Sequence, residues 1–110
     1  MGERDRRIGE NEAIFRQVNE RVSELNRSFS VVLERGDYLC ECGDEECVER
    51  IALTPEEYER VRADPTQFVV KPGHVAPDVE DVVRAEPEYR IVRKRDEDAA
   101  AIARETDPRS

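Results

Sequence analysis

The residues best suited to chemistry are three cysteines and one histidine. Cys40 and Cys42 stand two positions apart, Cys47 follows shortly after them, and His74 is the single histidine of the 110 residues. In an extended segment, side chains two positions apart point the same way, so the first two thiols can converge on one point. Gly43 permits a tight turn that swings Cys47 back toward them. Thiolate and imidazole are ligands that zinc prefers, so this pattern predicts a tetrahedral metal site.

His74 is the predicted fourth ligand. It follows an extended run, Phe68–Lys71, and stands in a turn with Pro72 and Gly73 that would expose its ring at the end of a strand. If that strand lies beside the cysteine segment, the imidazole reaches the thiols and completes a Cys₃His set. Sulfur-rich tetrahedral sites favour zinc or an iron–sulfur centre, and four ligands for one ion favour Zn²⁺. Two other interpretations stay open. The histidine could be a surface turn residue, with the shell completed by water or by Asp44, Glu45 or Glu46; or the cysteines could be buried or redox-active thiols.

The motifs of several enzyme classes are missing from the sequence. A catalytic zinc ion keeps an open coordination position, usually with histidine-rich ligands and a nearby general base. Here the predicted structural site uses every thiol and the one imidazole. The deaminase motifs H-x-E and P-C-x-x-C do not occur, and no glycine-rich loop offers to hold a phosphate. We therefore expect a protein that is not an enzyme.

The charge of the chain argues against general nucleic-acid binding. Lys and Arg number 18 against 27 Asp and Glu, which gives a net charge of −9. The densest basic run, from Arg90 to Arg95, stands next to the acidic residues 96–98. Binding to a nucleic-acid backbone needs clustered basic residues without such neighbours. A basic protein surface is the partner that this charge favours.

The first residues, Met1 to Arg7, are mostly charged and no apolar stretch follows them. This pattern is typical neither of a signal peptide nor of a transmembrane helix. Three cysteines bunched together are an odd number, which fits metal binding in a reducing compartment better than disulfides. We therefore expect a cytoplasmic protein.

The chain is predicted to fold as one α+β domain. We expect a small antiparallel sheet of three to four strands, a long N-terminal helix and two or three shorter helices, with residues 1–9 flexible, 10–106 forming the zinc-stapled domain and 107–110 a tail. Strands are expected at Tyr38–Cys42, Val48–Leu53, Phe68–Lys71 and Tyr89–Lys94. A capping box with Thr54 at the N-cap, Pro55 at the first helical position and Glu57 predicts the start of a helix. This helix should stop near Ala63, because Pro65 disfavours its continuation. Further helices are expected at Pro77–Ala85 and Asp96–Thr106.

The N-terminal helix is expected from about Glu10, and it carries an apolar stripe at alternating spacings of four and three residues. The stripe consists of Phe15, Val18, Val22, Leu25 and Phe29. In one interpretation it covers the domain's own sheet. In the other, Phe15, Val18, Val22 and Leu25 dock on a protein partner or pair two copies of the chain as a homodimer.

Over about residues 10–95 the chain resembles a group of small uncharacterised actinobacterial proteins that share a helix followed by a C-x-C-x₄-C…H unit. The likeness lies in the run Cys40–Cys47 with Val48-Glu49-Arg50-Ile51 and Leu53-Thr54 behind it, in Asp64–Val70, and in Pro72-Gly73-His74. The resemblance implies bound zinc and names no activity. The first half is also similar to SWIM-type zinc fingers, C-x-C…C-x-H, although position 49 is Glu where those fingers carry histidine.

These observations together predict a small cytoplasmic structural-zinc domain that acts as a protein-interaction or regulatory module. A zinc- or redox-responsive switch is one alternative, because clustered thiolates can be oxidised with loss of the metal. A nucleic-acid-associated zinc-finger regulator is another.

Overall fold

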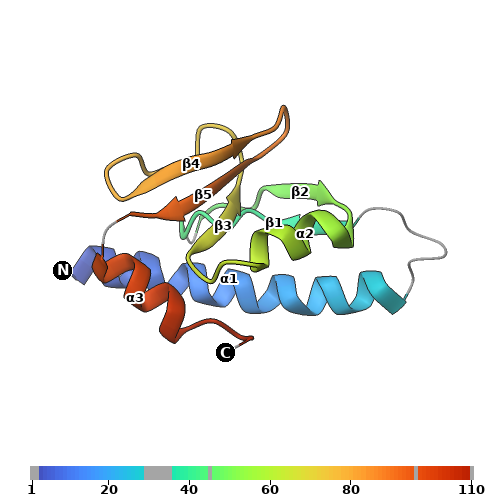
Figure 1. Cartoon of the computed structure of the whole chain (residues 1–110), viewed down its shortest axis with the longest axis horizontal. Helices are drawn as coiled ribbons and strands as arrows, with labels where there is room; N and C mark the ends of the chain where they lie inside the picture. The colour runs from blue at the N-terminus through green and yellow to red at the C-terminus, as the bar shows by residue number, and fades with distance from the viewer. Residues whose placement is uncertain (1–2, 29–35, 45, 96, 110) are drawn as a thin grey trace.

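A computed structural model describes residues 3–28, 36–44, 46–95 and 97–109 of the chain, and within them it contains three helices and five strands (Figure 1). The helices are α1 (Glu3–Ser28), α2 (Pro55–Arg62) and α3 (Glu97–Glu105). The strands are β1 (Gly36–Leu39), β2 (Arg50–Leu53), β3 (Gln67–Val70), β4 (Glu80–Ala85) and β5 (Arg90–Lys94). The expected α+β class, with a long N-terminal helix and shorter helices, is confirmed.

The strands form two antiparallel sheets where the sequence suggested one. In the first sheet β1 pairs with β2, and in the second the order is β3-β5-β4. The two sheets meet just after β1, where the backbone N–H of Glu41 donates to the carbonyl oxygen of Val69 at 2.8 Å. The chain that follows β1 therefore runs beside β3, and this junction brings the cysteine segment next to the second sheet.

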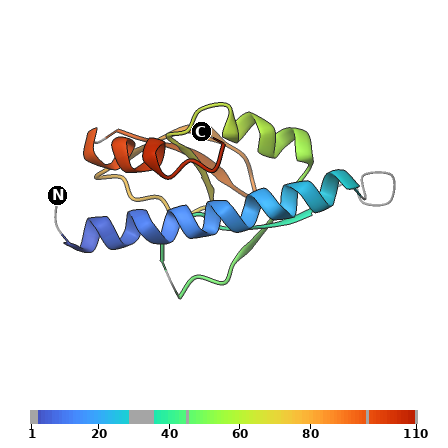
Figure 2. The ribbon, with the colours of Figure 1, turned by 90° about the horizontal axis from the view of Figure 1, so that it is seen from below.

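Helix α1 runs along the length of the molecule on one side of the sheets, with α2 and α3 beside it (Figures 1 and 2). It contacts β1, α3 and α2, while α2 packs on β3 and α3 on β5. Gly9 allows α1 to approach α3 closely, because a Cβ at this position would lie 3.1 Å from Cγ2 of Ile102. None of the described helices is long and apolar enough to cross a membrane.

The predicted capping box of α2 is confirmed in detail. The Thr54 hydroxyl oxygen accepts from the backbone N–H of Glu57 at 3.1 Å, and the Glu57 carboxylate accepts from the backbone N–H of Thr54 at 2.9 Å. These two bonds satisfy N–H groups that the start of a helix leaves without partners. The helix ends at Arg62 with Ala63 as its C-cap, as expected from Pro65.

The predicted helix at Pro77–Ala85 is wrong, because this segment contains strand β4 instead. The spacing of Val79, Val82 and Val83 imitated one face of a helix. In the structure a register shift between Val82 and Arg84 places an extra residue in the strand, which breaks the strict alternation typical of strands. Pairing of Val82 with Val92 on β5 and the high β propensity of valine explain why the strand forms.

Helix α1 differs from expectation at its start and in the face that it buries. It begins at Glu3 rather than near Glu10, so residues 3–9 belong to the helix. Glutamate and arginine, which dominate residues 3–7, are good helix formers. The buried face of α1 is mainly polar and consists of Glu12, Ala13, Arg16, Asn19 and Ser23.

The main core lies between α2 and the two sheets and contains the stacked rings of Tyr38 and Tyr58, whose centroids are 4.5 Å apart. Residues expected as a tail also pack on the body. Asp107 pairs with buried Arg62, and Arg109 pairs with Glu59 at 2.7 Å. The C-terminal residues up to 109 thus hold α2 in place next to α1.

Candidate metal centre

The cysteines lie on the connection between β1 and β2. The ladder of this hairpin continues past β1, because the backbone N–H of Cys40 donates to the carbonyl oxygen of Glu49 at 3.1 Å. Cys40 therefore stays in extended backbone next to the sheet. Its side chain is buried, whereas Cys42 and Cys47 are half-buried. The two strands expected on either side of the cysteine loop thus pair with each other as an antiparallel hairpin.

A tight turn carries the chain from Cys42 to Cys47. It begins at Gly43, whose φ of 81° lies in the left-handed region that favours glycine. The backbone N–H of Cys47 then donates to the carbonyl oxygen of Asp44 at 3.0 Å, and the Asp44 carboxylate accepts from the N–H of Glu46 at 2.9 Å. The Asp44 carboxylate thus stabilises the turn and is not among the candidate ligands.

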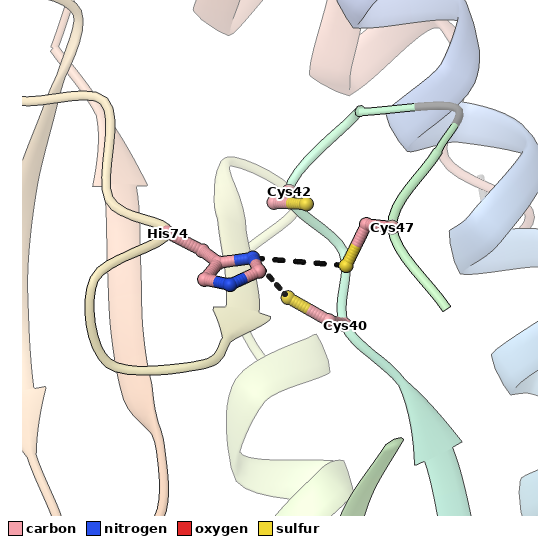
Figure 3. Close-up of side chains that lie close together, drawn as sticks. All are labelled: Cys40, Cys42, Cys47 and His74. Carbon is pink, nitrogen blue, oxygen red and sulfur yellow. Dashed lines mark hydrogen bonds between the residues drawn. The ribbon is translucent and has the colours of Figure 1, made fainter. Parts of the chain in front are cut away.

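His74 reaches the cysteines from the other sheet. After β3, the residues Lys71 to His74 form a turn closed by a 3.0 Å bond from the N–H of His74 to the carbonyl oxygen of Lys71. Pro72 occupies the second position and Gly73 the third with a φ of 87°, which is the pattern of a type II turn. The turn points the imidazole toward the sulfurs, as Figure 3 shows. The prediction that a strand-end turn presents His74 is therefore confirmed.

The ligand atoms of Cys40, Cys42, Cys47 and His74 all lie within 4.8 Å of one another. Nδ1 of His74 is 3.6 Å from Sγ of Cys40 and 3.6 Å from Sγ of Cys47 (Figure 3). A tetrahedron with Zn–S of ~2.3 Å and Zn–N of ~2.0–2.1 Å separates sulfur from nitrogen by about 3.6 Å. The donor set and its spacing therefore fit a tetrahedral ion such as zinc, with Nδ1 as the coordinating nitrogen.

The backbone assists the sulfurs. The N–H of Lys71 donates to Sγ of Cys40 at 3.2 Å. Backbone groups of Asp44 and Glu49 favour the thiolate forms of Cys42 and Cys47, although burial outweighs this for Cys47 and raises its pKa. Such bonds spread the negative charge of metal-bound thiolates.

The three thiols influence one another strongly. A hydrogen bond with Cys42 raises the pKa of Cys40, and burial raises it further. The same bond lowers the pKa of Cys42 to about 5, while burial raises the pKa of Cys47. The three thiols therefore differ in how readily they ionise, and a divalent ion would stabilise all three thiolates together.

Glu41, between the first two ligands, is a residue that the sequence did not single out. Its side chain is fully buried, and burial raises its pKa. The carboxylate accepts from the backbone N–H of Val69 at 3.0 Å, from Nδ2 of Asn19 at 2.8 Å and from the hydroxyl of Tyr58 at 3.0 Å. The alternation of extended backbone was the available signal: a residue between two candidate ligands points to the opposite face, which here is the interior.

The predicted partner-binding residues of α1 divide into two groups. Val18 is 40% exposed and Leu25 60% exposed, whereas Phe15 and Val22 are half-buried and Val22 packs against the core. The fifth residue of the stripe, Phe29, lies outside the described residues. Ile14, which was not part of the stripe, is 55% exposed on the same side of α1 as Val18.

Comparison with known proteins adds no family: no family model, no curated protein and no solved structure matches this chain. The resemblance to small actinobacterial C-x-C-x₄-C…H proteins therefore stays a prediction. The case for a metal centre depends on the Cys40, Cys42, Cys47 and His74 cluster itself.

Proposed function

We infer that this chain is a zinc-stapled domain that serves as a protein-interaction or regulatory module. The observation that carries the inference is the convergence of four side chains from two separate segments, with ligand atoms within 4.8 Å of one another. Three thiols and an imidazole rarely gather this closely without a metal, because the sulfurs would repel one another once ionised.

A structural role for the ion is favoured over a catalytic one. Protein side chains supply all four positions of the tetrahedron, so none is left for water or substrate. Three thiolates also make zinc electron-rich and a poor Lewis acid. We therefore propose that the protein is not an enzyme.

The position of the centre explains what the ion contributes. It would join the β1–β2 connection to the turn after β3, and so hold together two sheets that the described backbone joins at the Glu41–Val69 bond. The chain is 37% hydrophobic and 41% charged, which limits the apolar surface that it can bury. Small domains of this kind commonly need a metal or another cross-link to fold stably.

An interaction role is supported by the outer face of α1. Ile14, Val18 and Leu25 are all exposed along this helix, where a partner helix could contact them. Sedimentation of wild type and a Val18→Glu/Leu25→Glu variant tests the self-association form of this role. We expect a dimer only in the wild type, and a wild-type monomer at high protein concentration would exclude a homodimer through this face.

Metal content is the direct test of the zinc site. We expect purified wild type to hold about one zinc per chain and Cys42→Ser to hold almost none, since binding energy in such sites is folding energy. His74→Ala should retain zinc more weakly, because three thiolates remain. Val48→Ser is the matched control: Val48 follows Cys47 directly and is 80% exposed, so zinc content should not change. Equal zinc in wild type and Cys42→Ser would overturn the assignment.

A redox-responsive switch is a second candidate, and the partial exposure of Cys42 and Cys47 favours it. Two thiolates, one hydrogen peroxide and two protons would give one disulfide and two waters, with release of Zn²⁺. A peroxide titration followed with a zinc-release dye tests this candidate. Retention of zinc under mild oxidant would exclude it and leave the structural role in place.

A further inference from the structure

The segment that carries the first two metal ligands contacts α1 on its opposite side. Leu39, Glu41 and Gly43 alternate along the chain with Cys40 and Cys42. The Glu41 side chain and the backbone of Leu39 and Gly43 contact α1, whereas the two cysteines belong to the cluster with His74 (Figure 3). Because neighbouring side chains of an extended strand point to opposite faces, one short segment serves both the metal centre and the helix.

Two asparagines of α1 hold this segment. Asn19 is fully buried and binds the backbone of Leu39 twice, with its Oδ1 accepting at 2.7 Å and its Nδ2 donating at 2.9 Å. The same Nδ2 donates to the Glu41 carboxylate at 2.8 Å. Asn11, two helical turns earlier, donates from its Nδ2 to the carbonyl oxygen of Gly43 at 3.1 Å.

The Glu41 carboxylate is the centre of these contacts. Its three donors come from α1, from α2 and from β3, so they fix the side chain from three directions. A buried carboxylate costs free energy unless it is fully hydrogen-bonded. An apolar side chain would fill the same space, but it would not fix how the strand is rotated about its own axis. That rotation decides whether Sγ of both cysteines faces the ion.

We propose that Glu41 is a positioning residue of the metal centre and that, together with Asn19, it makes the docking of α1 depend on bound metal. The proposal rests on the zinc site proposed above. Zinc fixes the Cys40–Cys47 segment, and the fixed segment presents Leu39, Glu41 and Gly43 to α1 in the geometry that the two asparagines require. Linkage makes the effect reciprocal: undocking α1 must weaken zinc binding by the same factor by which losing zinc weakens docking.

The experiment compares wild type, Glu41→Gln and Asn11→Ala with a matched control, Glu80→Gln. Glu80 is also a buried carboxylate that accepts from a backbone N–H, that of Ala76, but its other partner is Lys94 and it does not contact the metal segment. Glutamine at position 41 presents an N–H₂ group where either one or two donors already point, because Oε1 accepts one bond and Oε2 accepts two. Asn11→Ala removes a contact of a half-buried residue and is the milder variant if Glu41→Gln does not fold.

Three readouts separate positioning from general destabilisation. Zinc affinity, measured by competition with a chromophoric chelator, should fall about 10–100-fold in Glu41→Gln, severalfold in Asn11→Ala, and less than about threefold in Glu80→Gln. The visible spectrum of the Co²⁺-loaded protein should change in Glu41→Gln and not in the control. Zinc should slow hydrogen exchange of α1 amides in wild type, and this increment should shrink in Glu41→Gln.

The outcomes distinguish this inference from the zinc site itself. A wild type that binds no zinc would overturn both. A wild type that binds zinc, with equal affinity and Co²⁺ spectrum in Glu41→Gln, would overturn the positioning role alone. Exchange of α1 amides that is the same with and without zinc in wild type would overturn the link to the helix.

Discussion

At the scale of single residues, two glycines lie on either side of the candidate metal centre and shape it. Gly43 follows Cys42 directly and Gly73 precedes His74 directly, and both have a positive φ. Side chains other than glycine, asparagine and aspartate reach this left-handed conformation only at a cost of about 1–2 kcal/mol. The ligands are therefore aimed by backbone conformation as well as by their own rotamers.

Gly73→Ala should weaken zinc binding by about 5–30-fold, because the alanine would carry that conformational cost when the turn presents His74. No atom lies within 4 Å of a Cβ built at Gly73, so crowding would add nothing. Gly73→Asn is the matched control, since asparagine tolerates the left-handed region. Chelator competition measures both affinities. Equal wild-type affinity in the two variants would show that the turn does not limit metal binding.

Glu12 should make stability depend on pH. Burial raises the pKa of Glu12 to about 7. The ammonium group of Lys94 lies 2.7 Å from the carboxylate and lowers the pKa, but it is shared with Glu80 and does not offset burial. The unfolded value is ~4.3, so the folded protein binds more protons between the two values. The part of the free energy of unfolding that comes from this raised pKa is fully present below the unfolded pKa, and it is lost as the pH rises through 7.

The measurement is urea unfolding of wild type and Glu12→Gln at several pH values. The glutamine stays neutral, so the stability of wild type relative to the variant should fall by roughly 1–3 kcal/mol between about pH 5 and pH 8. Zinc release at low pH affects both proteins alike and cancels in the difference. A constant difference, or one that grows with pH, would show that Lys94 outweighs burial.

The convergence of the four candidate ligands could be predicted from sequence because their chemistry is rare in this chain: three cysteines and one histidine have few uses together. Glu41 could not be predicted in the same way, because it is one of 27 acidic residues and most such residues are solvated. Only its position between two ligands of one strand indicated that it faces the interior. Its partners on α1 and α2 are distant in sequence and follow from the fold.

At the scale of elements, the apolar pattern of α1 predicted the helix but not the face that it buries. The spacing of Phe15, Val18, Val22 and Leu25 correctly predicted a helix, but the helix is rotated so that a polar face contacts the body and Leu25 is exposed. Hydrophobic periodicity assumes that apolar residues decide burial. Here Arg16 and Asn19 find hydrogen-bond acceptors on several other elements, and these partners cannot be read from the sequence of the helix.

Arg16 should be one of the most sensitive positions of α1. Its guanidinium donates to the carbonyl oxygens of Pro65 at 2.6 Å and Ala103 at 2.5 Å, and it stacks 4.6 Å from the ring centroid of Phe68. Lysine keeps the charge but has neither the planar fork nor the stacking surface. We therefore expect Arg16→Lys to lower the free energy of unfolding by roughly 2–3 kcal/mol.

The matched control is Arg21→Lys, because Arg21 is exposed on the same helix and should change stability by less than about 0.5 kcal/mol. Denaturant unfolding of both variants with saturating zinc measures the difference. Equal stabilities would mean that the buried polar face contributes specificity of docking without net stability.

Strand β4 was missed because it carries features typical of an edge strand. It lies at the end of the β3-β5-β4 order, so the second sheet ends there. Its bulge, its inward Glu80 paired with Lys94, and its exposed Asp81 and Arg84 are features that discourage pairing with another chain. These features disrupt the alternation that identifies a strand, which is why its sequence resembled a helix.

At the scale of the whole molecule, the order of the elements could largely be predicted, whereas the division of the strands into two sheets could not. Capping at Thr54, the turn at Pro72-Gly73 and the apolar runs of β3 and β5 are local signals. The division depends on which strands pair across long sequence distances, and the junction at Glu41 and Val69 is set by tertiary contacts. The candidate metal centre lies at this junction, so its ion would replace contacts that a continuous sheet would supply.

Removal of zinc should therefore destabilise the entire domain and not only its metal loop. An ion at 1,000 times its dissociation constant stabilises the folded state by about 4 kcal/mol, and tighter binding contributes more. For a domain of about 100 residues this corresponds to a melting temperature lower by roughly 15–30 °C after chelation. The β3-β5-β4 sheet should lose structure in the same transition as β1-β2, because α1 and the metal segment connect them.

Thermal melts followed by far-UV circular dichroism, with and without EDTA, measure this effect, and Cys42→Ser should be insensitive to the chelator. If EDTA left the wild-type melt unchanged, or melted the β1-β2 hairpin alone, the ion would be dispensable for joining the two sheets.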